Sequence, residues 1–189
     1  MISLKHLLVA AVLSLPSLVM ATPITYEGAL TSGVPVNGTV SSNGWINNIA
    51  SGVDFWSFTG NAGDTIILDG DRTNGALDLA MSLYFGFGGT EENFNQTASF
   101  DGLTFITSAD DNQSPNLPGP FGDPFIMIVL GQSGTFTVAI GGFASGASTA
   151  PYTYQLSYVR RAVPEPISLG LVVLGLAALG NARRQRAKA

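Results

Sequence analysis

The sequence predicts an all-β fold, an antiparallel β-sandwich or jelly roll of about eight or nine strands, between an N-terminal signal peptide and a C-terminal transmembrane helix. Three observations predict it. Apolar residues recur with a period of two in several segments, Gly, Asn, Asp and Pro stand at nearly every junction, and no helical periodicity occurs between residues 22 and 162. The chain therefore divides into residues 1–21, an exported domain at 22–162, and a tail at 163–189.

The N-terminal segment has the pattern of a secretory signal. Lys5 gives a positive start, Leu7–Leu13 is an unbroken apolar run, and Ala21 ends a stretch of small or permissive residues. This order predicts export through the general secretion machinery and cleavage by signal peptidase after Ala21. The alternative is an uncleaved membrane anchor, against which Pro16 and the short apolar run argue.

The middle segment alternates apolar and polar residues as half-buried strands do. In Asp78–Phe85 the side chains of Leu79, Met81, Leu83 and Phe85 point one way, and those of Ala80, Ser82 and Tyr84 the other. The other expected strands are Gly134–Gly142, Tyr152–Val159, Ile24–Leu30, Val36–Val40, Phe55–Thr59, Thr65–Leu68, Leu103–Thr107 and Phe125–Leu130. The stretch Ala109–Pro124 is predicted to be a long loop, which in a compact domain is usually functional or mobile.

The C-terminal segment has three parts. Pro164, Glu165 and Pro166 form a stiff leader, and Ile167–Gly180 follows without a charge. As a helix this apolar run spans about 21 Å, which is shorter than the hydrocarbon core of about 30 Å. Residues 181–189 carry the basic cluster Arg183, Arg184 and Arg186, which predicts a cytoplasmic tail and an outward-facing domain on a weak anchor.

This ordered tail, from Val163 to Ala189, resembles the PEP-CTERM sorting signal. The resemblance implies processing by an exosortase in a Gram-negative bacterium. It also implies transient residence in the inner membrane, delivery to the cell surface or the medium, and a host that makes exopolysaccharide. The alternative is an ordinary tail anchor.

Three stretches resemble the bacterial pre-peptidase C-terminal domain, a β-sandwich attached to secreted proteins. They are Asp54–Phe58 followed by Ala62–Ile66; Leu79–Tyr84 with Asp110 and Asp111 downstream; and Gly134–Val138 with Tyr152–Leu156. The resemblance covers about Val53 to Val159 and implies a sandwich for the middle segment.

The charges and the missing residue types exclude several functions. From Thr22 to Val159 the chain has 12 Asp and Glu and a single base, Arg72, so nucleic acid is not an expected partner. There is no Cys, and the only His is His6. Nucleophilic triads and histidine zinc sites therefore have no candidates, and we expect a protein that is not an enzyme. A hydrolase using carboxylates such as Glu91 and Glu92 is the remaining catalytic alternative.

The candidate metal ligands are Asp110 and Asp111 together with Asp123, at the two ends of the long loop. Carboxylate oxygens on a loop are what Ca²⁺ takes, whereas the alternative, favoured on composition, is that these residues only shape turns. Apart from calcium we expect no cofactor. Trp45, in a polar run, is the candidate ligand contact on the surface. The alternative, which is the commoner role of an aromatic residue in a β-protein, is that it packs in the interior, and Trp56 is expected in the core.

These expectations combine into a non-catalytic exported surface or matrix protein associated with exopolysaccharide, an association that comes from the PEP-CTERM resemblance. The alternative is a polysaccharide- or calcium-binding module that uses the loop and Trp45.

Overall fold

The computed structural model describes residues 21–73, 77–117, 121–144 and 152–163. Almost all of the expected signal peptide lies outside these residues. So do Pro164–Pro166, the expected membrane helix at 167–180 and the arginine cluster of the tail. In the described part of the chain, no helix has both the length and the apolar character needed to cross a membrane.

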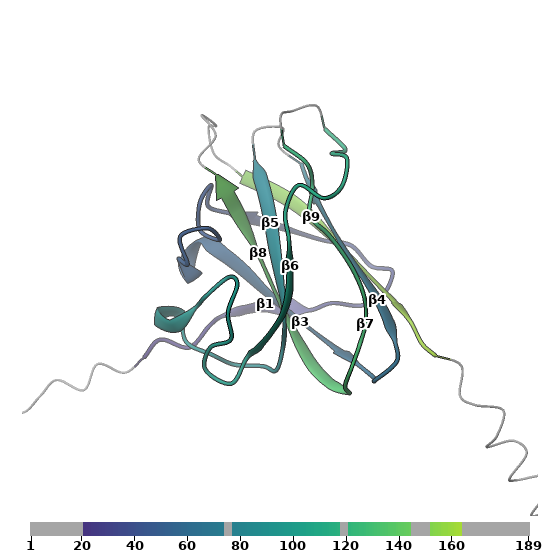
Figure 1. Cartoon of the computed structure of the whole chain (residues 1–189). Coiled ribbons are helices and arrows are strands. Elements are labelled where there is room, and N and C mark those ends of the chain that lie inside the picture. The colour runs from purple at the N-terminus through teal and green to yellow at the C-terminus, as the bar shows by residue number, and fades with distance from the viewer. Residues whose placement is uncertain (1–20, 74–76, 118–120, 145–151, 164–189) are drawn as a thin grey trace, which may run out of the picture.

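Within the described residues, nine strands form two sheets that face each other (Figure 1). They are β1 (Tyr26–Ala29), β2 (Val36–Val40), β3 (Val53–Gly60), β4 (Thr65–Arg72), β5 (Asp78–Phe85), β6 (Thr104–Ala109), β7 (Phe125–Val129), β8 (Gly134–Ala144) and β9 (Tyr152–Arg161). One sheet has the order β1-β3-β8-β5-β6 and the other β2-β9-β4-β7. Two 3₁₀ turns, η1 (Ala50–Gly52) and η2 (Glu91–Asn93), interrupt the connections. The predicted β-sandwich is confirmed.

One pair of strands departs from the predicted antiparallel arrangement. β1 pairs with β3 in parallel, with Tyr26 opposite Phe55, and every other pairing between the strands is antiparallel. The reason is the path of the chain. After β1 it crosses to the other sheet for β2, which pairs with β9, and then returns for β3. The five-stranded sheet is therefore mixed.

The main core lies between the sheets and is built from the alternating apolar residues. The five-stranded sheet contributes Phe58, Met81 and Phe136, and the four-stranded sheet contributes Ile66 and Leu156. Trp56 belongs to this core and is 8% exposed, as expected. Its indole N–H donates to the hydroxyl of Tyr154 at 2.8 Å, which satisfies the polar atom of each ring.

A second cluster covers the outer face of the five-stranded sheet, so the expectation that β5 is half-buried is wrong. Tyr84, on that outer face, is fully buried and packs edge-on against Phe100, and the cluster also holds Ile24 and Phe94. The cover comes from Ile24, before β1, and from two connections, residues 41–52 and 86–103. These loops give β5 an apolar environment on both faces, as a strand in the middle layer of three would have.

The same cover buries Trp45, so it is not the surface ligand contact for which it was a candidate, and the alternative of interior packing holds. Trp45 is 4% exposed, donates its indole N–H to the hydroxyl of Ser82 at 2.9 Å and lies 5.7 Å from the ring of Phe143. A polar stretch of sequence thus carries one large aromatic anchor, and the polar residues around it face outward. Trp45 is not available to a ligand in this structure.

Candidate metal centre

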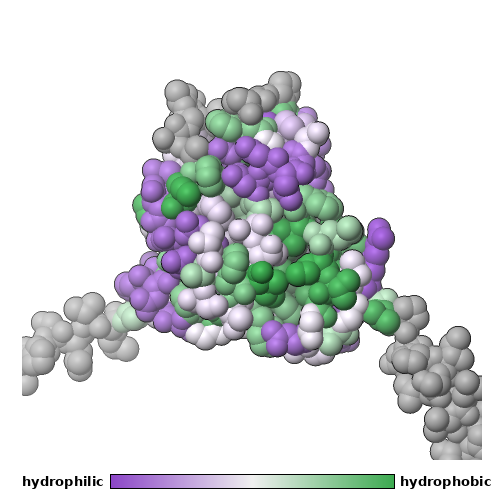
Figure 2. All heavy atoms as spheres, viewed as in Figure 1, coloured by the Kyte–Doolittle hydropathy of each residue, from purple (hydrophilic) through white to green (hydrophobic). Residues whose placement is uncertain are grey.

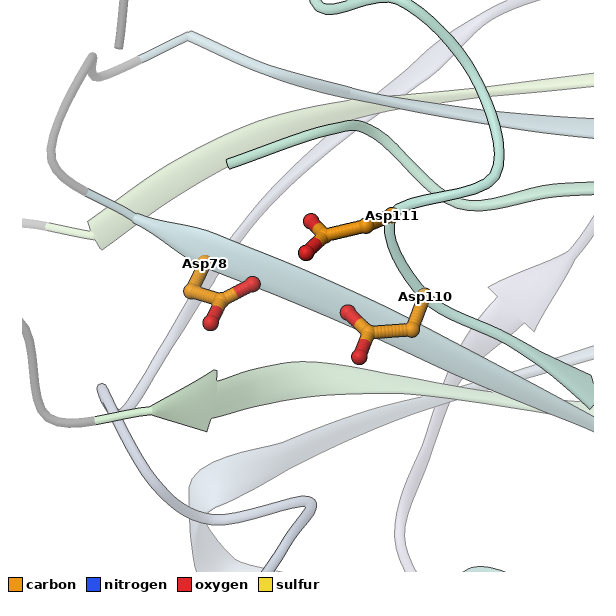
Figure 3. Close-up of side chains that lie close together, drawn as sticks. All are labelled: Asp78, Asp110 and Asp111. Atoms are coloured by element: carbon orange, nitrogen blue, oxygen red, sulfur yellow. The ribbon is translucent and has the colours of Figure 1, made fainter. Parts of the chain in front are cut away.

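Three aspartates meet at the end of the sandwich where β5 begins and β6 ends. The antiparallel register places Met81 of β5 opposite Ala109, the last residue of β6, so the start of β5 lies beside the residues that follow β6. Asp78 opens β5, and Asp110 and Asp111 come directly after Ala109. Figure 3 shows the three carboxylates directed toward one another, and one oxygen from each lies within 4.8 Å of the others.

The carboxylate of Asp78 is buried and only partly compensated. Asp78 is 3% exposed, and its Oδ1 has no hydrogen-bond partner, nor has Oδ1 of Asp110. Burial, followed by the negative charges of Asp110 and Asp111, raises the pKa of Asp78 from 3.8 to about 6. Burial and the charge of Asp111 likewise raise the pKa of Asp110 to about 6. Unbonded buried oxygens are costly, and a cation between these groups would remove both costs.

Asp111 ties the cluster to the long loop. Its Oδ1 accepts a hydrogen bond of 2.6 Å from the backbone N–H of Gly122, on the far side of the loop. Gly122 approaches so closely that a Cβ there would lie 2.7 Å from Cα of Asp111. The side chain of Asn112 adds a bond of 2.7 Å to the carbonyl of Phe125 and accepts one of 2.8 Å from its N–H. The two ends of the loop are thus held together beside the carboxylates.

Asp123, expected as the third ligand, lies elsewhere. It is fully buried, its Oδ1 is 3.7 Å from Nε of Arg72, and its Oδ2 accepts from the backbone N–H of Asn116 at 3.1 Å. Asp123 compensates the buried Arg72, and it also accepts a hydrogen bond from the loop backbone. Asp78 takes the place that the sequence assigned to Asp123.

Arg72 holds the described part of the loop from within the protein. Its guanidinium donates to the carbonyls of Leu77 at 3.3 Å, Leu117 at 3.1 Å and Phe121 at 2.6 Å. Arg72 is 1% exposed, so these bonds are shielded from water. Its charge also favours ionisation of nearby Asp78, although less strongly than burial opposes it.

The sequence suggested two of the three clustered carboxylates and missed the third. Asp110 and Asp111 stand out as a pair at a loop, whereas Asp78 is an ordinary polar residue at the start of an apolar strand. The register of β5 against β6 brings it to the site, and the only signal in the sequence was the adjacency of the two expected strand ends. Asp71, in β4, accepts a hydrogen bond from the side chain of Asn116 in the long loop.

Other depressions mark the surface, and two of them bear on function. A polar one of about 150 Å³ is lined by Glu27, Asp54 and Glu91, and would be the place for a carboxylate hydrolase. Its Asp54 already accepts a hydrogen bond of 2.7 Å from the hydroxyl of Tyr154. A groove of about 350 Å³ lies between β6 and the edge strand β7 and is lined by Ile106, Ile128 and Phe136. Figure 2 shows hydrophobic residues gathered at the lower right of this face.

Comparison with known proteins assigns the C-terminal segment. Residues 162–185 match the PEP-CTERM protein-sorting motif, which supports an exported protein sorted by exosortase. No curated protein matches the sequence.

Solved structures share the fold of the domain. The chain is similar to the surface-associated copper-binding protein CorA of Methylomicrobium album BG8, with a TM-score of 0.52 and 13% identity over 72% of this chain and 98% of that one. It is also similar to the copper-binding secreted protein MopE of Methylococcus capsulatus, with a TM-score of 0.50 and 8% identity over 69% and 85%. The pre-peptidase C-terminal domain of a Bacillus anthracis collagenase matches with a TM-score of 0.40 and 12% identity over 71% and 96%.

Proposed function

We propose that this chain is an exported, non-catalytic cell-surface or matrix protein that binds Ca²⁺ through Asp78, Asp110 and Asp111. The observation that carries the proposal is the buried, unbonded Oδ1 of Asp78 directed into a cluster of two further carboxylates. Three like charges this close repel one another, and a divalent cation turns that repulsion into attraction.

The ligand chemistry favours a hard cation. Each of the three side chains offers only carboxylate oxygens, the donors that Ca²⁺ takes, and the residues have different strand and loop origins that suit its flexible coordination. The structural neighbours bind copper according to their descriptions. At 13% and 8% identity that likeness extends to the fold alone. Soft or imidazole ligands favour copper, and no Cys or His belongs to this cluster.

The proposed role is to fix the long loop at the surface. A cation held by Asp111 would brace the bond from Gly122 and therefore both ends of the loop. In a protein that is sorted in hosts making exopolysaccharide, such a braced loop and its cation offer a contact for an anionic polysaccharide. We include exopolysaccharide as the proposed partner of the mature protein, and the inner membrane, signal peptidase and exosortase as its partners during maturation.

The test uses the exported, processed protein after treatment with EDTA. We expect added Ca²⁺ to raise the melting temperature, by roughly 5–10 °C at a hundredfold excess over the dissociation constant. The same titration with Mg²⁺ and Cu²⁺ identifies the preferred ion. No shift with any of the ions would overturn the metal site, and a shift with Cu²⁺ alone would replace calcium by copper.

A second measurement tests the proposed partner. The same protein is sedimented with purified exopolysaccharide of its host, first in Ca²⁺ and then in EDTA. We expect co-sedimentation that EDTA abolishes. Binding that persists in EDTA would show that the polysaccharide binds independently of the metal site. Absence of binding in both conditions would leave a calcium-stabilised surface protein with another partner.

A further inference from the structure

The first described residues of the chain lie along the β5–β6 connection. The N–H of Ile24 donates to the carbonyl of Gly89 at 3.1 Å, and the N–H of Glu91 donates to the carbonyl of Thr22 at 2.8 Å. Pro23 forms a bridge with Thr90 between them. These contacts hold the backbone on the C-terminal side of the Thr22 nitrogen, and they place that nitrogen beside η2.

A single carboxylate receives that nitrogen with both of its oxygens. The nitrogen of Thr22 lies 2.9 Å from Oε1 and 3.0 Å from Oε2 of Glu92. Glu92 is carried by η2, whose last residue, Asn93, is itself held by Asp101 at 3.0 Å. Hydrogen bonds, first from the Thr22 N–H, hold the pKa of Glu92 below its ordinary value. Glu92 is therefore ionised at neutral pH.

The geometry fits an ammonium better than an amide. A backbone amide has one hydrogen, and one hydrogen cannot be well aligned with two oxygens at once. An ammonium has three hydrogens and can give one to each oxygen, with a charge that strengthens both bonds. Cleavage after Ala21 would convert the Thr22 amide into an ammonium of this kind.

We propose that Glu92 is the binding site for the N-terminal ammonium that signal peptide removal creates at Thr22. In the processed chain the Thr22 ammonium then forms an ion pair with the carboxylate of Glu92. In the unprocessed chain the two oxygens share the single hydrogen of the Thr22 amide. This holds Ile24, which is 7% exposed, over the outer cluster beside Phe100 and Leu103. The inference rests on the proposed export and on cleavage after Ala21.

The site is specific for one cleavage position. Cα atoms of neighbouring residues are about 3.8 Å apart, so cleavage one residue earlier or later moves the ammonium away from both oxygens. A chain that keeps the signal peptide has no ammonium here at all. Removal of the signal peptide would therefore release the domain from its N-terminal membrane segment and would also add a contact within the folded domain.

The test measures the reactivity of the α-amine in the exported protein. The full chain is expressed with its own signal peptide in a Gram-negative host, and the mass of the N-terminal peptide defines the first residue. Acylation of the α-amine is then followed from about pH 7 to pH 9, where such amines titrate. We expect Glu92→Gln to acylate about two to five times faster than the unchanged protein, as befits an exposed ion pair. The neighbouring Glu91→Gln serves as the matched control and should acylate at the unchanged rate.

A variant with one Ala inserted between Ala21 and Thr22 keeps Glu92 but moves the α-amine by one residue, so it tests whether the position of the ammonium matters. If its mature protein starts at the inserted Ala, we expect its α-amine to react as fast as that of Glu92→Gln. Equal rates in the unchanged protein and Glu92→Gln, with Thr22 as the first residue, would overturn the binding site and leave export intact. A first residue other than Thr22 would overturn it as well. A chain that keeps its signal peptide would overturn both this inference and the proposed export.

Discussion

The charge of Asp78 is held where water does not reach it and where two further carboxylates face it. Arg72 offsets part of that charge, yet burial raises the pKa of Asp78 to about 6. The metal-free domain thus carries an electrostatic cost at this one residue, and the cost is the driving force we assign to cation binding.

Replacing Asp78 with Asn should change the stability of the metal-free and the Ca²⁺-bound protein in opposite directions. Asn has the same shape without the charge, so we expect the metal-free protein to become more stable by about 1–2 kcal/mol. Stabilisation by Ca²⁺ should be lost, because one of three carboxylates is gone. Urea unfolding with and without Ca²⁺ measures both effects. Glu91→Gln, outside the cluster, should change neither, and a Ca²⁺ response that survives in Asp78→Asn would remove this residue from the site.

The same carboxyl groups make the metal-free protein sensitive to pH. For Asp78 the pKa is 3.8 in the unfolded chain and about 6 in the folded one. Between these values the folded state binds more protons than the unfolded state, so its stability falls as the pH rises from about 4 to about 6. We expect this loss in EDTA and a smaller one in Ca²⁺, which competes with the protons. The same measurement on Asp78→Asn serves as the control. If the melting temperature in EDTA is no lower at pH 6 than at pH 4, and Asp78→Asn gives the same pH profile, then the raised pKa of Asp78 is contradicted.

Trp45 tests whether the outer cluster stabilises the domain. The side chain is buried and its N–H bonds Ser82, so Trp45→Ala should cost about 3–5 kcal/mol. Trp45→Phe keeps most of the apolar contact and should cost less, because only the hydrogen bond and part of the ring are lost. Thermal unfolding of the two variants orders them. Wild-type stability in Trp45→Ala combined with lost polysaccharide binding would instead return Trp45 to the surface.

At the scale of elements, the strands were readable because alternation is a local property. The expected ranges Val36–Val40 and Asp78–Phe85 agree with β2 and β5 residue for residue. The sequence did not show that both faces of β5 are covered. That depends on where residues 86–103 fold back, and the anchors Phe94 and Phe100 are scattered through a polar stretch without any period.

The site was half-readable for a related reason. Asp110 and Asp111 are neighbours in the chain, whereas Asp78 reaches them only through the pairing of β5 with β6. Asp123 was expected with them because it ends the same loop. In the structure Asp123 lies in the interior instead, beside the buried Arg72. A composition with one base and 12 acids between Thr22 and Val159 could have indicated that some acid must pair with that base, but not which one.

The long loop is predicted to depend on Arg72. Arg72→Met keeps the apolar stem but leaves Asp123 buried without its cation and removes bonds to the carbonyls of Leu117 and Phe121. We expect a loss of about 3–5 kcal/mol in the free energy of unfolding. The double variant Arg72→Met with Asp123→Asn should recover part of it, since the buried charge is then gone. Equal losses in the single and double variants, measured by urea unfolding, would show that the ion pair is not what matters.

At the scale of the whole molecule, the domain and its tail have separate proposed roles, binding in the domain and sorting in the tail. The acidic sandwich carries the proposed metal site and the captured N-terminus, and neither needs the tail. The matched segment at 162–185 begins at the end of the described domain, where the N–H of Val163 still donates to Asp64 at 3.4 Å. Asp64 also pairs with Arg160 at 2.6 Å, so the last strand is fastened just before the sorting motif starts.

This arrangement predicts that sorting can be blocked without disturbing the fold. Replacing Pro164, Glu165 and Pro166 with Ala removes the Pro-Glu-Pro element of the matched motif while leaving the domain, the apolar run and Arg183, Arg184 and Arg186 unchanged. We expect the variant to lose its signal peptide normally and to stay in the inner-membrane fraction with residues 163–189 still attached. The unchanged protein should instead be found at the surface or in the medium with a smaller mass. Intact mass and cell fractionation measure both, and the Ca²⁺-dependent melting temperature of the retained protein confirms that its domain has folded. Release at the normal mass despite the substitution would show that the tail is processed without the motif, and would leave the apolar run and the arginines as the features that matter.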